Sequence, residues 1–248
     1  MFLNDNIDLA LSYHENSKFL QCSLPFDTRT QYKIYPNAKA VQLKKPDSDL
    51  SNHLTYSFLR TLYGRRSTYS FSDKKINLDT LSYLLSLSFG IKCGQGETMK
   101  RTYASAGGRY PIEVYLAMLR TEDVQKGVYH YNVYDNSLEL IKTGGSEKLV
   151  ADFYSNQTEI VKENCTCIVL FTMVFERTMQ KYGARGYRFI FLDAGHMSQN
   201  LYLVSEYLGL GVVALGAGSK NDDDMDDILG LVTSQENAFY GFALGYPS

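Results

Sequence analysis

The sequence predicts an α+β fold, and three observations support that prediction. Leucines recur at helical spacing between residues 78 and 88, which is typical of an amphipathic helix. Residues 127–141 have the pattern of an antiparallel hairpin, and residues 165–175 are apolar at nearly every position, as in a central strand. Helices and hairpins follow one another without a regular alternation of strand and helix, so we expect an α+β protein rather than a doubly wound sheet.

Composition indicates an ordinary folded protein and argues against several function classes. The 248 residues are 44% hydrophobic and 21% charged, which is enough to bury a large core. The net charge of −2 argues against a nucleic-acid binder. The amino terminus lacks the pattern of a signal peptide, and the longest apolar run, residues 167–175, is too short to cross a bilayer. We therefore expect a soluble, cytoplasmic protein that has no membrane partner.

Residues 1–55 are weakly patterned and contain three of the five prolines. We expect an irregular N-terminal extension there, which packs against a domain or subunit or docks a partner. Residues 56–248 are expected to form one domain. At its start, a helical pattern over residues 54–63 ends at Gly64.

The elements that follow are bounded by local signals. Asn77 is a candidate N-cap and Gly90 a stop for the helix that begins at Leu78. The long helix carries a stripe of small and large residues that includes Phe191, Ala194 and Leu201. The remaining expected elements are a strand over 112–119, hairpin strands over 127–132 and 137–141, a helix over 146–154, the central strand, the long helix over 187–208, a short strand from 210 and a last strand over 238–245.

Two groups of residues resemble metal sites, but their spacing favours structural roles. Cys165 and Cys167 share one face of an apolar strand, and no second close pair of Cys or His completes a ligand set. Five aspartates lie between residues 222 and 227, where the amino end of a helix would stabilise them. The sequence therefore predicts buried thiols and no metal.

Two loops have the composition of a ligand site. Arg65, Arg66 and Ser67 offer forked and small donors that suit a phosphate, although a solvated basic turn would have the same sequence. Residues 105–108 read Ser-Ala-Gly-Gly before a strand, and backbone without Cβ atoms can lie flat against a planar cofactor. A structural glycine pair in a tight loop is the alternative.

Lys181 and Tyr182 are adjacent, and adjacent residues on a continuous helix do not point the same way. Gly183 and Gly186 follow them and favour a helix end or turn. Such a break would let both side chains approach one cavity.

In this order, these segments resemble the nitroreductase superfamily. More narrowly, they are similar to its azoline (thiazoline/oxazoline) dehydrogenase branch, which includes the microcin B17 and streptolysin S dehydrogenase subunits. The resemblance implies an FMN-binding fold with a central, mostly antiparallel sheet flanked by helices, in a homodimer. It is carried by RRS at 65–67, SAGGRYPIEVY at 105–115, KYGARGYR at 181–188 and GHMSQNLYL at 195–203.

The resemblance also implies roles for individual residues. FMN would be held by three groups, which are Arg65, Arg66 and Ser67; Ser105, Ala106 and Gly107; and Leu215, Gly216 and Ala217. Lys181 and Tyr182 match the catalytic pair. Tyr69 stands where the family often has a second basic residue, and no basic tail precedes Ser248. We therefore expect Arg185 or Arg188 to contribute to the phosphate site.

The implied reaction is oxidation of azolines, formed from Cys, Ser or Thr of a precursor peptide, to thiazoles or oxazoles. A cyclodehydratase and a leader-peptide-binding subunit would be the partner proteins. The reaction needs a hydride acceptor, which FMN supplies, and a base. Neither Lys nor Tyr is a base at neutral pH without help, and either could act once the other or burial assists it.

Two alternatives stay open. An NAD(P)H-dependent nitro- or quinone reductase on the same fold leaves Lys181 and Tyr182 without a task. A flavin-free scaffold subunit would explain Tyr69 and the missing basic tail.

Overall fold

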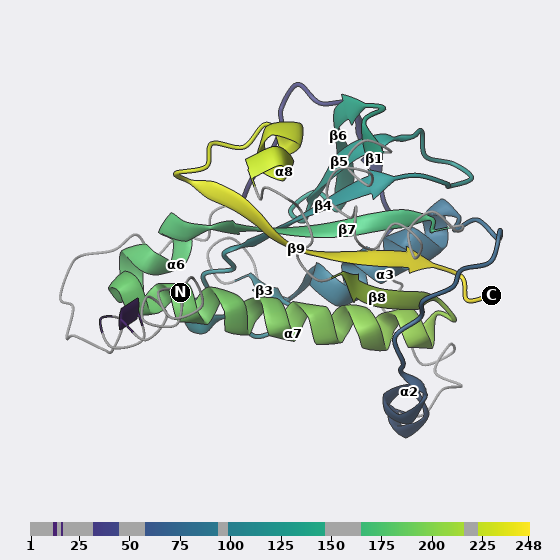
Figure 1. The fold of residues 1–248 in the computed structure, drawn as a ribbon, viewed down its shortest axis with the longest axis horizontal. Coiled ribbons are helices and arrows are strands. Elements are labelled where there is room, and N and C mark those ends of the chain that lie inside the picture. The colour runs from purple at the N-terminus through teal and green to yellow at the C-terminus, as the bar shows by residue number, and fades with distance from the viewer. Residues whose placement is uncertain are drawn as a thin grey trace, which may run out of the picture.

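The computed structural model describes residues 12–13, 16, 32–44, 58–93, 99–146, 165–215 and 223–248. Their centre is a seven-stranded sheet with the order β1-β6-β5-β4-β7-β9-β8, in which every pairing of neighbouring strands is antiparallel (Figure 1). The strands are β1 (Ala40–Gln42), β4 (Ile112–Met118), β5 (Gly127–Asn132), β6 (Ser137–Thr143), β7 (Cys167–Val174), β8 (Gly211–Leu215) and β9 (Glu236–Gly245). The expected α+β class with a mostly antiparallel sheet is confirmed.

Helices cover both faces of the sheet. On one face α3 (Leu78–Phe89) and α7 (Gly186–Tyr207) pack against the larger hydrophobic cluster, whose centre includes Phe171 and Phe242. On the other face α8 (Asp223–Leu229) places Met225 and Leu229 in a smaller cluster with Leu170. The short helices α2 (Phe58–Gly64) and α6 (Phe175–Tyr182) lie toward opposite ends of α7 (Figure 1).

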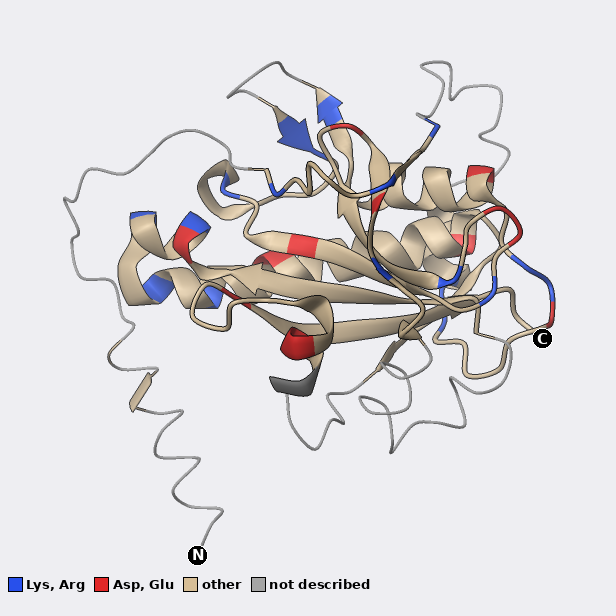
Figure 2. Cartoon of the chain, turned by 90° about the horizontal axis from the view of Figure 1, so that it is seen from above, with Lys and Arg blue, Asp and Glu red and all other residues tan. Residues whose placement is uncertain are grey.

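A separate two-stranded hairpin joins β2 (Ile91–Cys93) to β3 (Lys100–Arg101). Figure 2 shows Lys and Arg gathered on these two short strands, which stand clear of the main sheet. The hairpin leads directly into the segment that contains Ser105–Gly108, so it belongs to the surroundings of the candidate site.

Several local predictions are confirmed. The Asn77 side chain accepts a hydrogen bond from the Thr80 amide at 2.8 Å, and the Gly90 amide closes the helix on Ser86. Strand β7 is buried along nearly its whole length between β4 and β9. Cys165 and Cys167 are both buried, as expected, but they do not share one face. Cys167 belongs to the larger cluster and Cys165 to the smaller one, because β7 begins only at Cys167.

Other predictions need correction or lie beyond the described residues. The buried face of α7 includes Ile190 and Asp193, whereas Phe191 is 44% exposed, so the expected stripe is out of phase there. Within residues 1–55, residues 40–42 form the edge strand β1, which is too short to show a strand pattern. The domain boundary stays a prediction, and most of the expected helix over 146–154 lies outside the described residues.

The aspartate run begins α8, but one of its members has a different task. Asp226 is buried and accepts hydrogen bonds from the Asn237 side chain and the Ala238 amide, both at 2.7 Å, so it fixes the start of β9. Over the described ranges, no three His, Cys, Asp or Glu residues are grouped so that they could hold a metal ion. No helix in those ranges is long and apolar enough to span a membrane.

Candidate active site

The loop over residues 104–110 is held in place by one buried carboxylate. Asp193 of α7 accepts a hydrogen bond from Ser105 Oγ at 2.5 Å and another from the Ala106 amide at 3.2 Å. Ser105 Oγ in turn accepts from the Tyr110 amide at 2.8 Å, which closes the loop on itself. Burial raises the pKa of the Asp193 carboxyl, and the two hydrogen bonds oppose that rise. Asp193 therefore fixes the backbone that was expected to face a cofactor.

Two more polar residues extend this contact along the same helix face. His196 Nδ1 lies 2.9 Å from the Ala104 carbonyl, and Asn200 Nδ2 donates to the Thr102 carbonyl at 3.4 Å. Positions 193, 196 and 200 share a face because they are separated by three and four residues. None of these three side chains was predicted to have a role, although their spacing on a helix is a signal that could have indicated a shared polar contact.

The Lys181–Tyr182 pair meets this loop at Gly107. A Cβ placed on Gly107 would lie 2.5 Å from Tyr182 Oη and 2.8 Å from Lys181 Nζ, so both head groups approach the same backbone atom. Gly107 and Gly108 have φ values of +60° and +66°, which L side chains rarely adopt. The loop thus has glycine where space and backbone conformation both require it.

The pair converges because helix α6 ends at Tyr182. Gly183 has a φ of +56° and breaks the helix, and a 3₁₀ turn over Gly183–Arg185 precedes α7. The Lys181 ammonium lies 5.2 Å from the centre of the Tyr182 ring, and that ring packs edge-on against Phe189 at 5.0 Å. The predicted break therefore occurs, and it brings both side chains to one place.

A second corner of the site lies further along α7. Ser67 forms an isolated bridge with Val212 of β8, and the Arg65 guanidinium lies 5.4 Å from the centre of the Tyr202 ring. Tyr202 is nine residues beyond Asp193, which is about 14 Å of helix. Leu215 is buried at the end of β8, while Gly216 and Ala217 lie outside the described residues.

The other arginines that were expected to bind the FMN phosphate lie near the two ends of α7. Arg66 is exposed beside Arg65. Arg185 lies 5.8 Å from the centre of the Phe189 ring, and Arg188 lies 6.0 Å from that of Tyr13. Arg185 is separated from the Tyr202 position by about 26 Å of helix. Within one chain, Arg185 and Arg65 therefore do not contact the same phosphate group.

Comparison with known proteins identifies the family. Residues 62–246 match the nitroreductase family, which is most of the chain. The chain belongs to the nitroreductase family. It is 31% identical over 163 residues to MJ1384 of Methanocaldococcus jannaschii, a protein that carries the name nitroreductase, and the match covers 65% of this chain and 79% of that one.

Peptide-processing proteins of this family are also similar to the chain. The microcin B17-processing protein McbC of Escherichia coli is 34% identical over 149 residues, covering 58% of this chain and 54% of McbC. The E. coli microcin synthetase McbBCD complex, solved with truncated pro-MccB17 bound, contains a chain with a TM-score of 0.66 and 21% identity. That match covers 99% of this chain and 94% of the solved one. These similarities agree with the branch expected from the sequence.

A buried ionic network joins strands β4, β5 and β6 to helix α6. Glu113 of β4 pairs with Arg177 of α6 and lies 2.9 Å from His130 Nε2, while Glu139 lies 2.9 Å from His130 Nδ1. Burial alone would raise the pKa of Glu113, but Arg177 and His130 hold it well below its usual range. Burial alone would lower the pKa of His130, but its two glutamate partners raise it.

This network fixes α6 against the loop. Arg177 Nη1 donates to the Tyr110 carbonyl at 3.1 Å, and Arg109 Nε donates to the Arg177 carbonyl at 2.7 Å. Arg177 lies one helical turn before Lys181, so the ion pair with Glu113 positions the helix that carries the catalytic candidates.

Proposed function

We propose that this nitroreductase-family protein is a cytoplasmic, FMN-dependent dehydrogenase that oxidises peptide-borne thiazolines or oxazolines to thiazoles or oxazoles. The observation that carries the proposal is the approach of Lys181 Nζ and Tyr182 Oη to Gly107. Two groups able to move a proton thus lie against the glycine loop that the resemblance assigns to the flavin. The similarity to McbC supports a task in processing a modified peptide.

The residues present fit FMN at both corners. The Ser105–Gly107 backbone has no large side chain and is held rigidly by Asp193, as a planar ring requires. Arg65, Arg66 and Ser67 supply donors for a phosphate at the second corner. Leu215, with Gly216 and Ala217, would offer backbone to the ring, and Arg185 would reach a phosphate only from another chain. When bound, FMN supplies the hydride acceptor that side chains lack.

In the proposed reaction, the azoline loses a hydride from one ring carbon and a proton from its neighbour, and a carbon–carbon double bond forms between them. Tyr182 Oη takes the proton as the general base. Lys181 orients the Tyr182 ring, because its ammonium lies 5.2 Å from the centre of that ring. The Gly107 backbone keeps both head groups facing one reacting centre.

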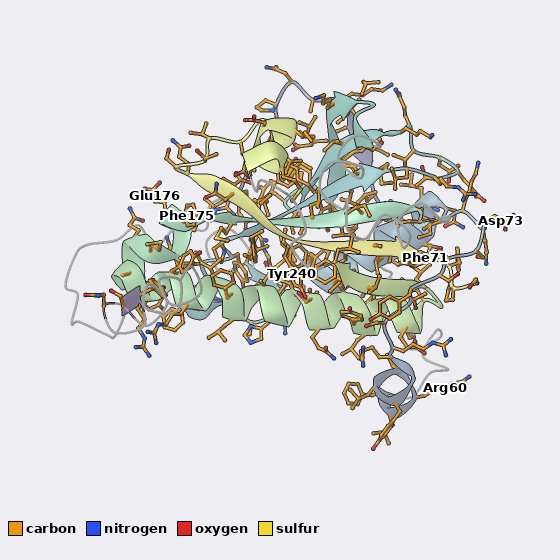
Figure 3. The ribbon with its side chains drawn as sticks, in the orientation of Figure 1. Arg60, Phe71, Asp73, Phe175, Glu176 and Tyr240 are labelled. Atoms are coloured by element: carbon orange, nitrogen blue, oxygen red, sulfur yellow. The ribbon has the colours of Figure 1, made fainter. Side chains whose placement is uncertain are left out.

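The proposed assembly is a homodimer that works with a cyclodehydratase and a leader-peptide-binding subunit on an azoline-bearing precursor peptide. Helix α2 supports the homodimer, because Phe58 is 68% exposed and Tyr63 85% exposed on one short helix. Figure 3 shows this helix, marked by Arg60, standing off the body of the chain. A second subunit that packs on α2 would cover this apolar surface.

Mass spectrometry of a thiazoline-bearing peptide, incubated with the purified protein, tests the proposal. We expect each ring to lose two hydrogens, and we expect Tyr182→Phe and Lys181→Ala to slow that loss by about 100-fold or more. Tyr134→Phe and Lys142→Ala, at exposed positions of the β5–β6 hairpin, are the matched controls and should react normally. An unchanged peptide mass with rapid oxidation of NAD(P)H would instead indicate a reductase, and a protein without flavin would indicate a scaffold.

A further inference from the structure

A cationic pocket lies between the β2–β3 hairpin and the outer side of the 104–110 loop. Its volume is about 370 Å³. Its lining contains no Asp or Glu, and the residues that matter here are Lys92, Lys100, Arg101, Tyr103, Ser105 and Tyr110. The proposed reaction uses none of the three cations of this pocket, although Ser105 also belongs to the proposed flavin site.

Arg101 is the unusual member of the lining, because it is only 5% exposed. Its Nη1 donates to Tyr103 Oη at 3.1 Å. Its Nε and Nη2 are buried and have no hydrogen-bond partner in the described part of the chain. The neighbouring Thr102 Oγ1 is also buried and unsatisfied there. A buried guanidinium with two unused donors is costly unless an anion completes it.

No carboxylate of the described residues serves Arg101 as an ion-pair partner. Glu113 acts on it through space, but Glu113 is already paired with Arg177 and His130. Instead, the Arg101 guanidinium lies over the Tyr110 ring, 4.9 Å from its centre. Stacking occupies the face of the guanidinium and leaves its edge for an in-plane acceptor.

The two lysines complete the electrostatics of the pocket. Lys92 and Lys100 are exposed on the two hairpin strands, and both line the pocket. A Cβ placed on Gly108 would lie 3.4 Å from Lys100 Nζ, so this ammonium reaches back to the loop. Exposed ammonium groups beside a buried guanidinium can attract an oxyanion and then orient it.

We propose that this pocket is an oxyanion-binding site, which takes a carboxylate or phosphate group through the edge of Arg101, with Lys92 and Lys100 assisting. A bidentate contact with Arg101 would satisfy both unused donors. Because the same loop carries Gly107 and Gly108, a ligand held here would be anchored beside the proposed reaction centre. The site does not depend on the proposed dehydrogenase activity, since its chemistry is that of the pocket alone.

Nuclear magnetic resonance of the ¹⁵N-arginine-labelled protein tests this site directly. Inorganic phosphate and succinate are titrated separately while the Nε–H resonance of Arg101 is followed, assigned by its loss in Arg101→Lys. We expect a saturable shift with at least one probe. Lys100→Ala changes an exposed side chain and leaves the core intact. We expect it to lower the affinity for that probe by about fivefold. Lys142→Ala, on the distant β6 strand, should leave the affinity unchanged.

The two probes also separate the sources of the anion. A response to phosphate alone assigns the pocket to a phosphorylated ligand, and a response to succinate alone assigns it to a carboxylate such as an acidic peptide side chain. The proposal is overturned if neither probe produces a saturable shift of Arg101, or if Lys100→Ala and Lys142→Ala bind the probe equally well.

Discussion

Replacing Gly107 by alanine tests the convergence of Lys181 and Tyr182 most directly. The new Cβ would lie 2.5 Å from Tyr182 Oη, whereas ordinary contact begins at 3.4 Å, so the phenol must retreat by about 1 Å. Lys181 Nζ, at 2.8 Å from the Cβ, must also move. Displacing a catalytic group by about 1 Å costs on the order of 100-fold in rate. We therefore expect Gly107→Ala to oxidise an azoline peptide about 100-fold more slowly than the unmodified protein.

Backbone strain has to be separated from this displacement. Alanine at a φ of +60° costs about 1 kcal/mol whatever surrounds it. Gly144 has a similar φ of +69°, and a Cβ placed there would meet nothing within 4 Å, so Gly144→Ala is the matched control. Both variants should lose about 1 kcal/mol in urea unfolding, and only Gly107→Ala should lose activity.

The assay is the rate of two-hydrogen loss from a thiazoline peptide under single-turnover conditions, with flavin content measured on each variant. Equal rates for Gly107→Ala and Gly144→Ala would refute the reasoning, because they would mean that neither head group needs its place against the loop. A loss of flavin without displacement of the side chains would instead assign Gly107 to cofactor binding.

Three further predictions concern groups away from the reacting centre. Asp193→Asn should cost about 1–2 kcal/mol in urea unfolding and speed hydrogen exchange of the loop amides, because a charged acceptor is lost; unchanged exchange would contradict the role of Asp193. The pKa of His130 is raised in the folded protein, so protonated His130 stabilises the fold fully below the ordinary histidine pKa of about 6.5. This stabilisation is lost as pH rises from there through the raised pKa, so the free energy of unfolding should fall above about pH 6.5. His130→Gln should not show this fall. Burial raises the pKa of Cys165 to about 12, so iodoacetamide should label the exposed Cys93 in the folded protein and Cys165 only after unfolding; comparable labelling rates by mass spectrometry would contradict its burial.

The fold was predictable where the signal is local. Asn77 and Gly90 bound a helix through hydrogen bonds to residues three or four positions away, and the structure has both. The apolar run of β7 likewise specifies burial on both faces without knowledge of its neighbours. The break after Tyr182 follows from Gly183, whose conformation needs no distant partner.

The site was predictable only in part, because some of its contacts join residues far apart in the sequence. Asp193 accepts a hydrogen bond from Ser105, which lies 88 positions earlier. The residues next to Asp193 in the sequence give no sign of this partner. The same contact accounts for the wrong prediction that Phe191 lies on the packed stripe of α7. The helix directs Asp193, His196 and Asn200 toward the loop, and Phe191 is left exposed. The network around His130 depends on strand register, which chain order does not reveal.

The order of strands has a consequence for how the protein is made. Among the described strands, β8 pairs only with β9, so β8 cannot join the sheet on the ribosome until the residues of β9 have been synthesised. The corner that contains Ser67 bridges to β8, so its place beside the sheet depends on β9. The contacts of the Ser105 loop come instead from α6 and α7, which are synthesised earlier. The two halves of the proposed flavin site therefore form at different times during translation. A nascent chain whose β9 residues have not yet emerged from the ribosome should be unable to retain the cofactor.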